Sequence, residues 1–271
     1  MLVNVTIPVY NEAERLPRSL PRLHRFLCEN CPFDFEMVIA DNGSTDETPT
    51  LAADLARKHR QVRVLRLEEP GRGRALKRAW RESGADILSY MDVDLSTDLA
   101  AFGPLIKPLA EGGFDMAIGS RLLPGSVTTR GWKRDLISRS YNHLLKLGFR
   151  AEFADAQCGF KAITRSAAAA LLPLVEDDAW FFDTELLILA QKLGYRVFEL
   201  PVRWVDDSDS HVRIWRTAIE DIKGLLRVRR NLDRTTHSAT PSRRVSSAME
   251  QRAVDRCASN QNADGASGGE P

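Results

Sequence analysis

Short apolar runs, each followed by a polar segment or by apolar residues at helical spacing, alternate along the first half of the chain. The runs lie at residues 3–10, 35–40, 62–67 and 86–94 and are rich in β-branched side chains, as strands are. After the first run, leucines recur every three or four positions, which indicates an amphipathic helix. This alternation predicts an α/β fold, with a mostly parallel sheet and helices on both faces.

Polar side chains stand where the apolar runs end. Tyr10 and Glu12 follow the first run, Asp41 closes the second, and Asp92 and Asp94 close the fourth. The carboxyl ends of parallel strands meet at one edge of such a sheet, which is where open α/β sheets bind ligands. We therefore expect these side chains to belong to one site.

The sequence Asp92-Val93-Asp94 is the most informative of these strand ends. Carboxylates at positions i and i+2 of an extended segment point to the same side, so these two can share a cation. Hard oxygen ligands suit Mg²⁺ or Mn²⁺, which keep open positions for substrate phosphates. The alternative interpretation is a pair of solvated aspartates that open a turn, because aspartate is a common turn residue.

The second half of the chain carries two basic amphipathic segments. Residues 125–150 and 211–230 each place tryptophan and aliphatic side chains on one helical face and basic side chains opposite. Such segments either lie on a membrane surface or pack against their own sheet, and the pattern leaves both open. From about residue 233 the composition turns to Ser, Thr, Asn, Gly and Ala, which predicts a globular domain over 1–232 and a disordered tail over 233–271.

Composition narrows the setting of the protein. The 271 residues are 43% hydrophobic, enough for a sizeable core, and a net charge of +1 gives no general attraction to nucleic acid. No apolar run approaches the ~18 residues needed to cross a bilayer, and the sequence opens on a strand-like segment and not on a signal peptide. The four cysteines show no disulfide framework. These features predict a cytoplasmic protein, peripheral on the inner face of the cytoplasmic membrane where the basic segments bind lipid.

Several short motifs occur in an order and at a spacing typical of one family. They are IPVYNE at 7–12, ADNGSTDET at 40–48, GRGRA at 71–75, DVDLS at 92–96, GSR at 119–121, QCGFK at 157–161 and FFDTELL at 181–187. Together they resemble the family 2 glycosyltransferases of GT-A fold and, within these, the polyprenyl-phosphate (dolichyl-phosphate) sugar synthases. The QCGFK and FDTEL versions are more similar to the glucosyltransferase branch than to the mannosyltransferase branch.

The resemblance implies a metal-dependent enzyme with a nucleotide-sugar donor. Pro8, Tyr10, Glu12 and Asp41 would hold the nucleotide, since carboxylates accept the N–H and hydroxyl hydrogens that a base and a ribose present.

The resemblance also implies how the donor diphosphate is bound. Asp92 and Asp94 would hold Mg²⁺ or Mn²⁺ there, with Asp94 counted among the catalytic groups. Gly71 and Arg72 in the glycine-rich turn are candidates for the donor phosphates, and Arg213 would supply a further cation.

The acceptor implied by the resemblance is a polyprenyl phosphate. Arg121, with Arg134 and Ser138 on the first basic segment, would grip its phosphate, and Gln157 would contact substrate. A phosphate is already anionic near pH 7, so the expected reaction is direct displacement at the anomeric carbon, with inversion and without a strong general base.

The sequence departs from the family pattern at several positions. Asn42 stands where many relatives have a second aspartate, Arg72 where they have lysine, and Ser96 where some mannosyl relatives have a glutamine metal ligand. Asp183 and Glu185 either cap a helix, as acids in a first turn do, or contact the sugar or the acceptor.

The favoured function is therefore transfer of a hexose, with glucose from UDP-glucose preferred, to a polyprenyl phosphate at the cytoplasmic membrane face. The alternatives are a GDP-mannose-dependent polyprenyl-phosphate mannosyltransferase, a family 2 glycosyltransferase with a soluble acceptor, and a nucleotide-binding module without turnover. The sugar and the nucleotide stay open, because a few side chains around the base and the hexose decide both.

Overall fold

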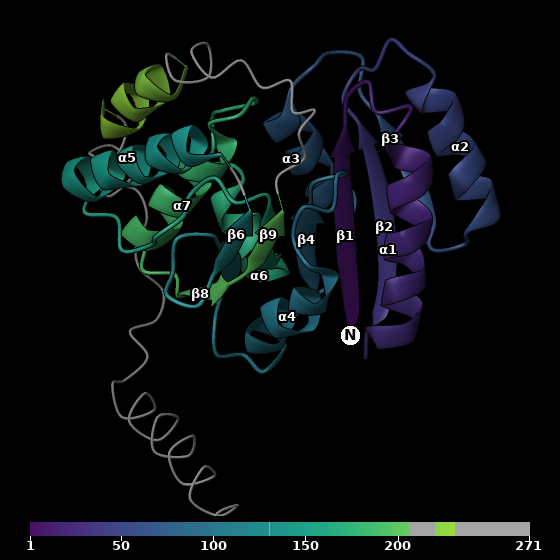
Figure 1. Cartoon of the computed structure of the whole chain (residues 1–271), viewed down its shortest axis with the longest axis horizontal. Coiled ribbons are helices and arrows are strands. Elements are labelled where there is room, and N and C mark those ends of the chain that lie inside the picture. Colours follow the sequence, from purple (N-terminus) through teal and green to yellow (C-terminus); the bar gives the residue numbers. More distant parts are fainter. Residues whose placement is uncertain (130, 206–219, 231–271) are drawn as a thin grey trace, which may run out of the picture.

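A seven-stranded mixed sheet with helices on both faces forms the body of the protein (Figure 1). The computed structural model describes residues 1–129, 131–205 and 220–230. The strand order is β3-β2-β1-β4-β7-β5-β8, and every neighbouring pair is parallel except those that β7 makes. The strands are β1 (Leu2–Val9), β2 (Asp34–Asp41), β3 (Val62–Arg66), β4 (Ile87–Met91), β5 (Met116–Ser120), β7 (Phe160–Thr164) and β8 (Val197–Pro201).

The helices and a small second sheet complete the described elements. The helices are α1 (Leu16–Asn30), α2 (Thr48–Lys58), α3 (Arg72–Glu82), the short 3-10 helix η1 (Leu99–Ala101), α4 (Phe102–Ala110), α5 (Trp132–Phe149), α6 (Arg165–Leu171) and α7 (Phe182–Lys192). Residues 220–230 are also helical. Strands β6 (Val127–Thr129) and β9 (Arg203–Val205) pair in parallel as a separate two-stranded sheet.

Each face of the main sheet carries its own hydrophobic cluster. Along β4, Ile87 and Met91 join the cluster that contains the α1 leucines, whereas Leu88 and Tyr90 join the one formed with α3, α5, α6 and α7. This alternation follows from the two-residue period of a strand. All five residues of β4 are buried, so its carboxyl end delivers the segment that follows it from the middle of the sheet.

The predicted α/β architecture is confirmed, including the run that becomes β4 and the helix with its four buried leucines. The antiparallel strand β7 was not predicted. It lies between β4 and β5, and its position depends on pairing with strands distant in the sequence, which local periodicity does not report.

Ser44 and Glu47 have the spacing of a capping box but do not form one. Helix α2 begins at Thr48, and Glu47 at its N-cap makes no side-chain capping hydrogen bond. The backbone N–H of Ser44 instead donates to Oδ1 of Asp41 at 2.9 Å. The carboxylate at the end of β2 therefore organises this turn, as aspartate side chains commonly do.

The two basic segments are helical only in part. In the first, residues 127–129 form β6 and the helix begins at Trp132. In the second, the structure describes a helix over 220–230, while residues 211–219 and the tail at 233–271 lie outside the described residues. In the part of the chain that is described, no helix is long and apolar enough to cross a membrane.

Candidate active site

The strand ends singled out in the sequence meet at one edge of the sheet. Strand β1 lies between β2 and β4, with Val9 opposite Asp41 and Thr6 opposite Tyr90. The segments that follow these strands therefore leave the sheet side by side, as expected for parallel neighbours.

Asp41 is the most deeply buried of the predicted nucleotide-binding residues. Its Oδ1 accepts the N–H of Ser44, but Oδ2 has no hydrogen-bond partner among the described residues; its charged neighbour is Nε of Arg66 at 3.6 Å. A buried carboxylate oxygen without a donor is costly, so this atom is poised for an N–H or O–H supplied by a ligand.

The other predicted nucleotide residues surround a strained turn. Asn11 has a φ of +54° and is held there because its N–H donates to Ser44 Oγ and its Oδ1 accepts the N–H of Thr45, both at 2.9 Å. The neighbouring Tyr10 is half exposed, whereas Glu12 is paired with an adjacent arginine. Pro8 is half-buried near the end of β1. The turn thus presents the aromatic ring of Tyr10 one residue after Val9, which pairs with Asp41 in the sheet.

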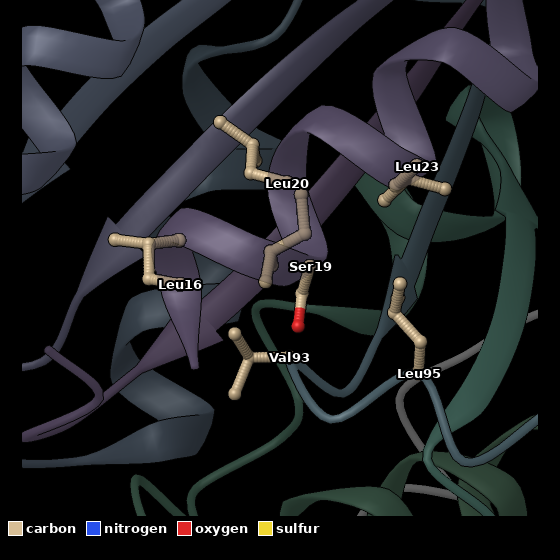
Figure 2. A pocket seen from close by; sticks show the side chains of 7 residues that line it. Leu16, Ser19, Leu20, Leu23, Val93 and Leu95 are labelled. Carbon is tan, nitrogen blue, oxygen red and sulfur yellow. The ribbon is translucent and has the colours of Figure 1, made fainter. Parts of the chain in front are cut away.

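Along the loop after β4, apolar side chains that pack against the core alternate with more accessible aspartates. Val93 and Leu95 point into an apolar crevice against helix α1, lined by Leu16, Leu20 and Leu23 (Figure 2). Asp92 precedes Val93, and Asp94 lies between Val93 and Leu95; both aspartates are only half-buried. The two apolar residues therefore fix the loop, and the two carboxylates stay on its accessible side.

The carboxylate of Asp92 is held in place from several directions. Its backbone N–H donates to the carbonyl of Gly159 at 3.2 Å, and Arg72 Nη2 lies 2.5 Å from its Oδ1. Its Oδ2 occupies the space where a side chain at position 159 would begin, because a Cβ built on Gly159 overlaps that oxygen. Asp94 accepts the N–H of Ser96 at 3.0 Å.

These residues fit a divalent cation that is shared with a substrate. Among the described residues no group of three or more His, Cys, Asp and Glu side chains forms a metal site by itself. Mg²⁺ in phosphate-transfer and related sites is usually held by one or two carboxylates plus substrate phosphates. Asp92 and Asp94 supply that donor set, so they would hold the ion together with the donor diphosphate.

Arg72 faces two carboxylates and not an open phosphate site. Its Nη1 lies 2.6 Å from Asp183, its Nη2 contacts Asp92, and the guanidinium stacks on the rings of Tyr90 and Trp180. Burial alone would lower the pKa of Arg72, but Asp92, Tyr90 and Asp183 outweigh it and raise that pKa well above its usual value. Arg72 is therefore held against Asp92, the residue expected to bind the metal, and its direct contact with a donor phosphate stays a prediction.

Arg121 is also engaged by a carboxylate. Its Nε and Nη2 lie 2.7 and 2.9 Å from the two oxygens of buried Asp155, and the guanidinium stacks on Trp204. A bidentate pair of this kind is rigid and strong. The guanidinium of Arg121 is thus fixed by Asp155, and its expected contact with the acceptor phosphate stays a prediction.

The segment 155–159 joins both sides of the site. Asp155 holds Arg121, the N–H of Ala156 donates to Asn142 on α5 at 3.0 Å, and Gly159 contacts Asp92. The side chain of Gln157, predicted to contact substrate, donates a hydrogen bond to Asp221 at 3.2 Å and so contacts the helix at 220–230.

Two of the predicted acceptor residues lie on α5. Ser138 is buried, and its Oγ has no hydrogen-bond partner within the described part of the chain. Arg134 is half-buried one turn earlier. Arg213, predicted to supply a further cation for the donor phosphates, lies outside the described residues.

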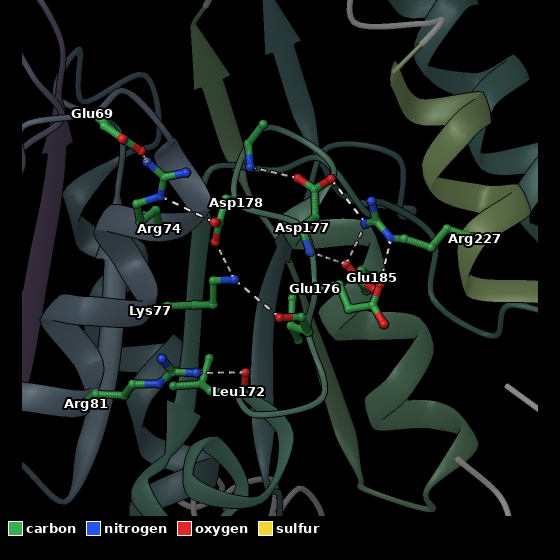
Figure 3. A network of polar contacts seen from close by, with 12 residues as sticks. Glu69, Arg74, Lys77, Arg81, Leu172, Glu176, Asp177, Asp178, Glu185 and Arg227 are labelled. Atoms are coloured by element: carbon green, nitrogen blue, oxygen red, sulfur yellow. Dashed lines mark hydrogen bonds and ion pairs between the residues drawn. The ribbon is translucent and has the colours of Figure 1, made fainter. Parts of the chain in front are cut away.

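Asp183 and Glu185 do not face a substrate, contrary to one of the two readings of the sequence. They are 4% and 3% exposed. Asp183 pairs with Arg72 and Lys161. Glu185 accepts hydrogen bonds from Arg227 at 2.9 Å and from the N–H of Asp177 at 2.8 Å (Figure 3).

Charged residues around the loop 176–178 connect the helix at 220–230 with α3. Arg227 contacts Asp177 on one side, and Asp178 contacts Lys77 and Arg74 on the other (Figure 3). The N–H of Arg74 also donates to the carbonyl of Asp178 at 3.1 Å. The amino end of α3, which carries Arg72, is therefore held by this loop.

Comparison with known proteins defines the class of this protein. Residues 4–172 match the model of Glycosyl transferase family 2, and the chain belongs to that family. It is accordingly a nucleotide-sugar glycosyltransferase of GT-A fold.

The relatives that match this chain include a member of the glucosyltransferase branch that the motifs indicated. The chain is 40% identical over 225 residues to Glycosyltransferase AglD of Haloferax volcanii, covering 82% of this chain and 35% of that protein. It is 33% identical over 222 residues to the dolichyl-phosphate beta-glucosyltransferase of Drosophila melanogaster, covering 77% of this chain and 68% of that protein. The chain thus spans about a third of AglD and about two thirds of the fly enzyme.

A solved structure shares the fold. Glucosyl-3-phosphoglycerate synthase from Mycobacterium tuberculosis, in complex with Mn²⁺, UDP and phosphoglyceric acid, superposes with a TM-score of 0.64 and 19% identity. The match covers 84% of this chain and 78% of that chain.

We predict that Gly159→Ala removes metal-dependent donor binding without unfolding the protein. The new Cβ would overlap Asp92 Oδ2, so this carboxylate must turn away. Gly84→Ala is the control, because a Cβ there has no neighbour within 4 Å. Calorimetric titration with a nucleoside diphosphate and Mn²⁺ should show a loss of about tenfold or more for Gly159→Ala only. Equal affinity of the two variants would contradict the placement of Asp92.

A second prediction concerns pH and the helix at 220–230. Burial, with Asp177 and Glu220, raises the pKa of Asp221 to about 7. The pKa of Asp221 in the folded protein exceeds its pKa in the unfolded chain, which is about 4. The stability that this group contributes is therefore fully present below about pH 4 and is lost as the pH rises through about 7.

Thermal unfolding at pH 5.5 and pH 8.5 tests this linkage. Asp221→Asn keeps the shape of the side chain but cannot ionise, so the midpoint of the variant should fall less between the two pH values than that of the wild type. Identical pH dependence of the two proteins would exclude Asp221 as the responsible group.

Proposed function

We propose that this protein transfers glucose from UDP-glucose to a polyprenyl phosphate of the dolichyl type, with inversion at the anomeric carbon. The likeness to dolichyl-phosphate beta-glucosyltransferases supports the sugar and the acceptor. The observation that carries the proposal is helix α5, which has predicted acceptor residues on one side and a row of exposed apolar side chains on the other.

Asp41 and the loop after β4 would hold the donor. The buried Oδ2 of Asp41, which accepts no hydrogen bond from the described residues, suits the imide N–H of uracil, and the exposed ring of Tyr10 could stack on the base. Mg²⁺ or Mn²⁺ held by Asp92 and Asp94 would neutralise the charge of the leaving diphosphate. Arg72 would act on the leaving diphosphate indirectly, by holding Asp92 in place.

Ser138 and Arg134 would receive the acceptor phosphate. The buried Ser138 Oγ lacks a partner among the described residues, so it can donate to a phosphate oxygen. Arg121, fixed by Asp155, would form the adjoining wall. An acceptor oxygen then forms the bond to the anomeric carbon while the bond to the diphosphate breaks, and UDP leaves with the electron pair.

The exposed apolar side chains of the two helices would meet the membrane. Most of the exposed large hydrophobic residues in the described part of the chain lie on them: Trp132, Leu136, Ile137, Leu144 and Leu147 on α5, and Ile222 and Leu226 at 220–230. Leu225 and Val228 of the second helix pack in the same cluster as Leu145 of α5. Exposed Lys223, Arg229 and Arg230 add positive charge. Apolar and basic side chains in this combination favour an anionic lipid surface.

An acceptor assay tests the proposed reaction. Purified protein is incubated with radiolabelled UDP-glucose or GDP-mannose, with dolichyl phosphate in detergent, with 3-phosphoglycerate or without acceptor. We expect organic-extractable label only with UDP-glucose, dolichyl phosphate and Mg²⁺ or Mn²⁺. Label on 3-phosphoglycerate would favour a soluble acceptor, and label from GDP-mannose would replace glucose by mannose.

We further predict that the double substitution Leu144→Ser/Leu147→Ser weakens membrane binding and leaves folding intact. Both side chains are exposed, and insertion of each into lipid is worth about 1 kcal/mol, so co-sedimentation with anionic liposomes should weaken about tenfold or more. Val127→Ser/Val205→Ser, on the small sheet, is the matched control because these residues are also exposed. Equal loss in both variants, or no binding of the wild type at low salt, would rule out the two helices as the membrane surface.

A further inference from the structure

A row of alternating charges runs from the interior to the loop after β4. Lys161 Nζ lies 3.2 Å from Asp183 Oδ1, Arg72 Nη1 lies 2.6 Å from Asp183 Oδ2, and Arg72 Nη2 lies 2.5 Å from Asp92 Oδ1. Each oxygen of Asp183 therefore serves a different cation. The row ends at a residue that would hold the donor's metal ion.

The inner members of this row are almost completely shielded from water. Lys161 is 0% exposed, Asp183 4% and Arg72 9%. Lys161 also donates to the hydroxyl of Tyr90 at 3.1 Å and to the carbonyl of Cys158 at 2.5 Å, and the hydroxyl of Tyr90 donates to Asp183. The carboxylate of Asp183 is thus held by three side chains, those of Arg72, Lys161 and Tyr90.

This fixed carboxylate determines where Arg72 points. The guanidinium is planar, it stacks on Tyr90 and Trp180, and its Nη1 is tied to Asp183. With the plane and one corner fixed in this way, Nη2 lies 2.5 Å from Asp92 Oδ1. Gly159 closes the opposite side of the same carboxylate.

We propose that Asp183 is a positioning residue for Asp92, acting through Arg72, and that it increases the affinity of the site for the divalent ion of the donor. This inference rests on the proposed role of Asp92 in metal binding. Asp183 contributes in two ways, and both increase the affinity for the metal ion. It orients the carboxylate of Asp92, and it shares the positive charge of Arg72, which would otherwise compete with the metal ion for Asp92.

The chain offers a closely matched control on the same helix. Glu185 lies two residues after Asp183 on α7, is similarly buried, and also pairs with an arginine, Arg227. Its removal should destabilise the protein in a similar way, but Glu185 has no contact with Arg72 or Asp92 among the interactions of the described residues. Glu185→Gln therefore separates a general loss of packing from the positioning of Asp92.

The experiment measures Mn²⁺ binding directly, by the electron paramagnetic resonance signal of free Mn²⁺ in the presence of UDP and in the absence of any acceptor. We expect Asp183→Asn to weaken Mn²⁺ binding about tenfold to a hundredfold, the usual effect of losing a partner of a metal ligand, and Glu185→Gln to leave it unchanged. UDP binding without metal should be equal in both variants and in the wild type.

Arg72→Lys keeps the result decisive where Asp183→Asn fails to fold. A lysine keeps the charge but cannot bridge two carboxylates in a fixed plane, so Mn²⁺ binding should again weaken. Arg78→Lys, six positions on in α3 and paired within the helix with Glu82, is its control.

Unchanged Mn²⁺ affinity in the folded Asp183 or Arg72 variant, or an equal loss in the Glu185 variant, would overturn the inference. Asp92→Asn distinguishes this from a wrong metal assignment, because normal Mn²⁺ binding by that variant would remove the metal role of Asp92 itself. Failure of lipid-acceptor transfer alone would leave the Mn²⁺ result standing.

Discussion

The burial of two cations next to one carboxylate constrains the centre of this protein. Asp183 comes from α7, Arg72 from the start of α3 and Lys161 from β7, so these three elements must meet before both cations contact Asp183. Removing one partner of a buried pair costs about 3–5 kcal/mol, whereas well-packed apolar residues often serve stability equally well. Stability alone therefore does not explain this arrangement, and its position behind Asp92 gives it a functional reason.

The surrounding packing keeps this centre rigid. Trp80 of α3 contacts the rings of Tyr90 and Phe182, with centroids 6.1 Å apart in each case. Gly73 lies so close to Phe182 that a Cβ there would be 2.7 Å from the Cβ of that residue. Helices α3 and α7 therefore approach closely at the point where Arg72 and Asp183 meet. The glycine-rich turn, which suggested phosphate binding, serves here to bring two helices together.

The sequence predicted those features that local patterns determine. Strand β4 is an uninterrupted buried run, and α1 has leucines at helical spacing, so both elements could be recognised. Asp41, Asp92 and Asp94 follow parallel strands, and the topology alone brings such residues to one edge. The antiparallel strand β7 could not be predicted in this way, because its place is set by pairing with β4 and β5.

The partners of the arginines were not predictable for a related reason. Arg72 lies 111 positions from Asp183, and Arg121 lies 34 positions from Asp155. An arginine near a glycine-rich or polar motif is typical of phosphate binding, and nothing in the local sequence shows that a distant carboxylate already occupies it. Asp183 and Glu185 were ambiguous because their position in a first helical turn explains their charge equally well.

The segment 155–159 then determines how the two halves of the site work together. It contacts Arg121 and Asn142 on the side proposed for the acceptor, and its Gly159 contacts Asp92 on the side proposed for the donor. Direct displacement by an anionic oxygen needs no strong base, but the reacting atoms must be held about 3–3.5 Å apart and in line. For such a reaction the protein contributes mainly fixed distances, and a short segment bonded to both sides is the element that sets them. The buried charges behind Asp92 serve the same requirement on the donor side.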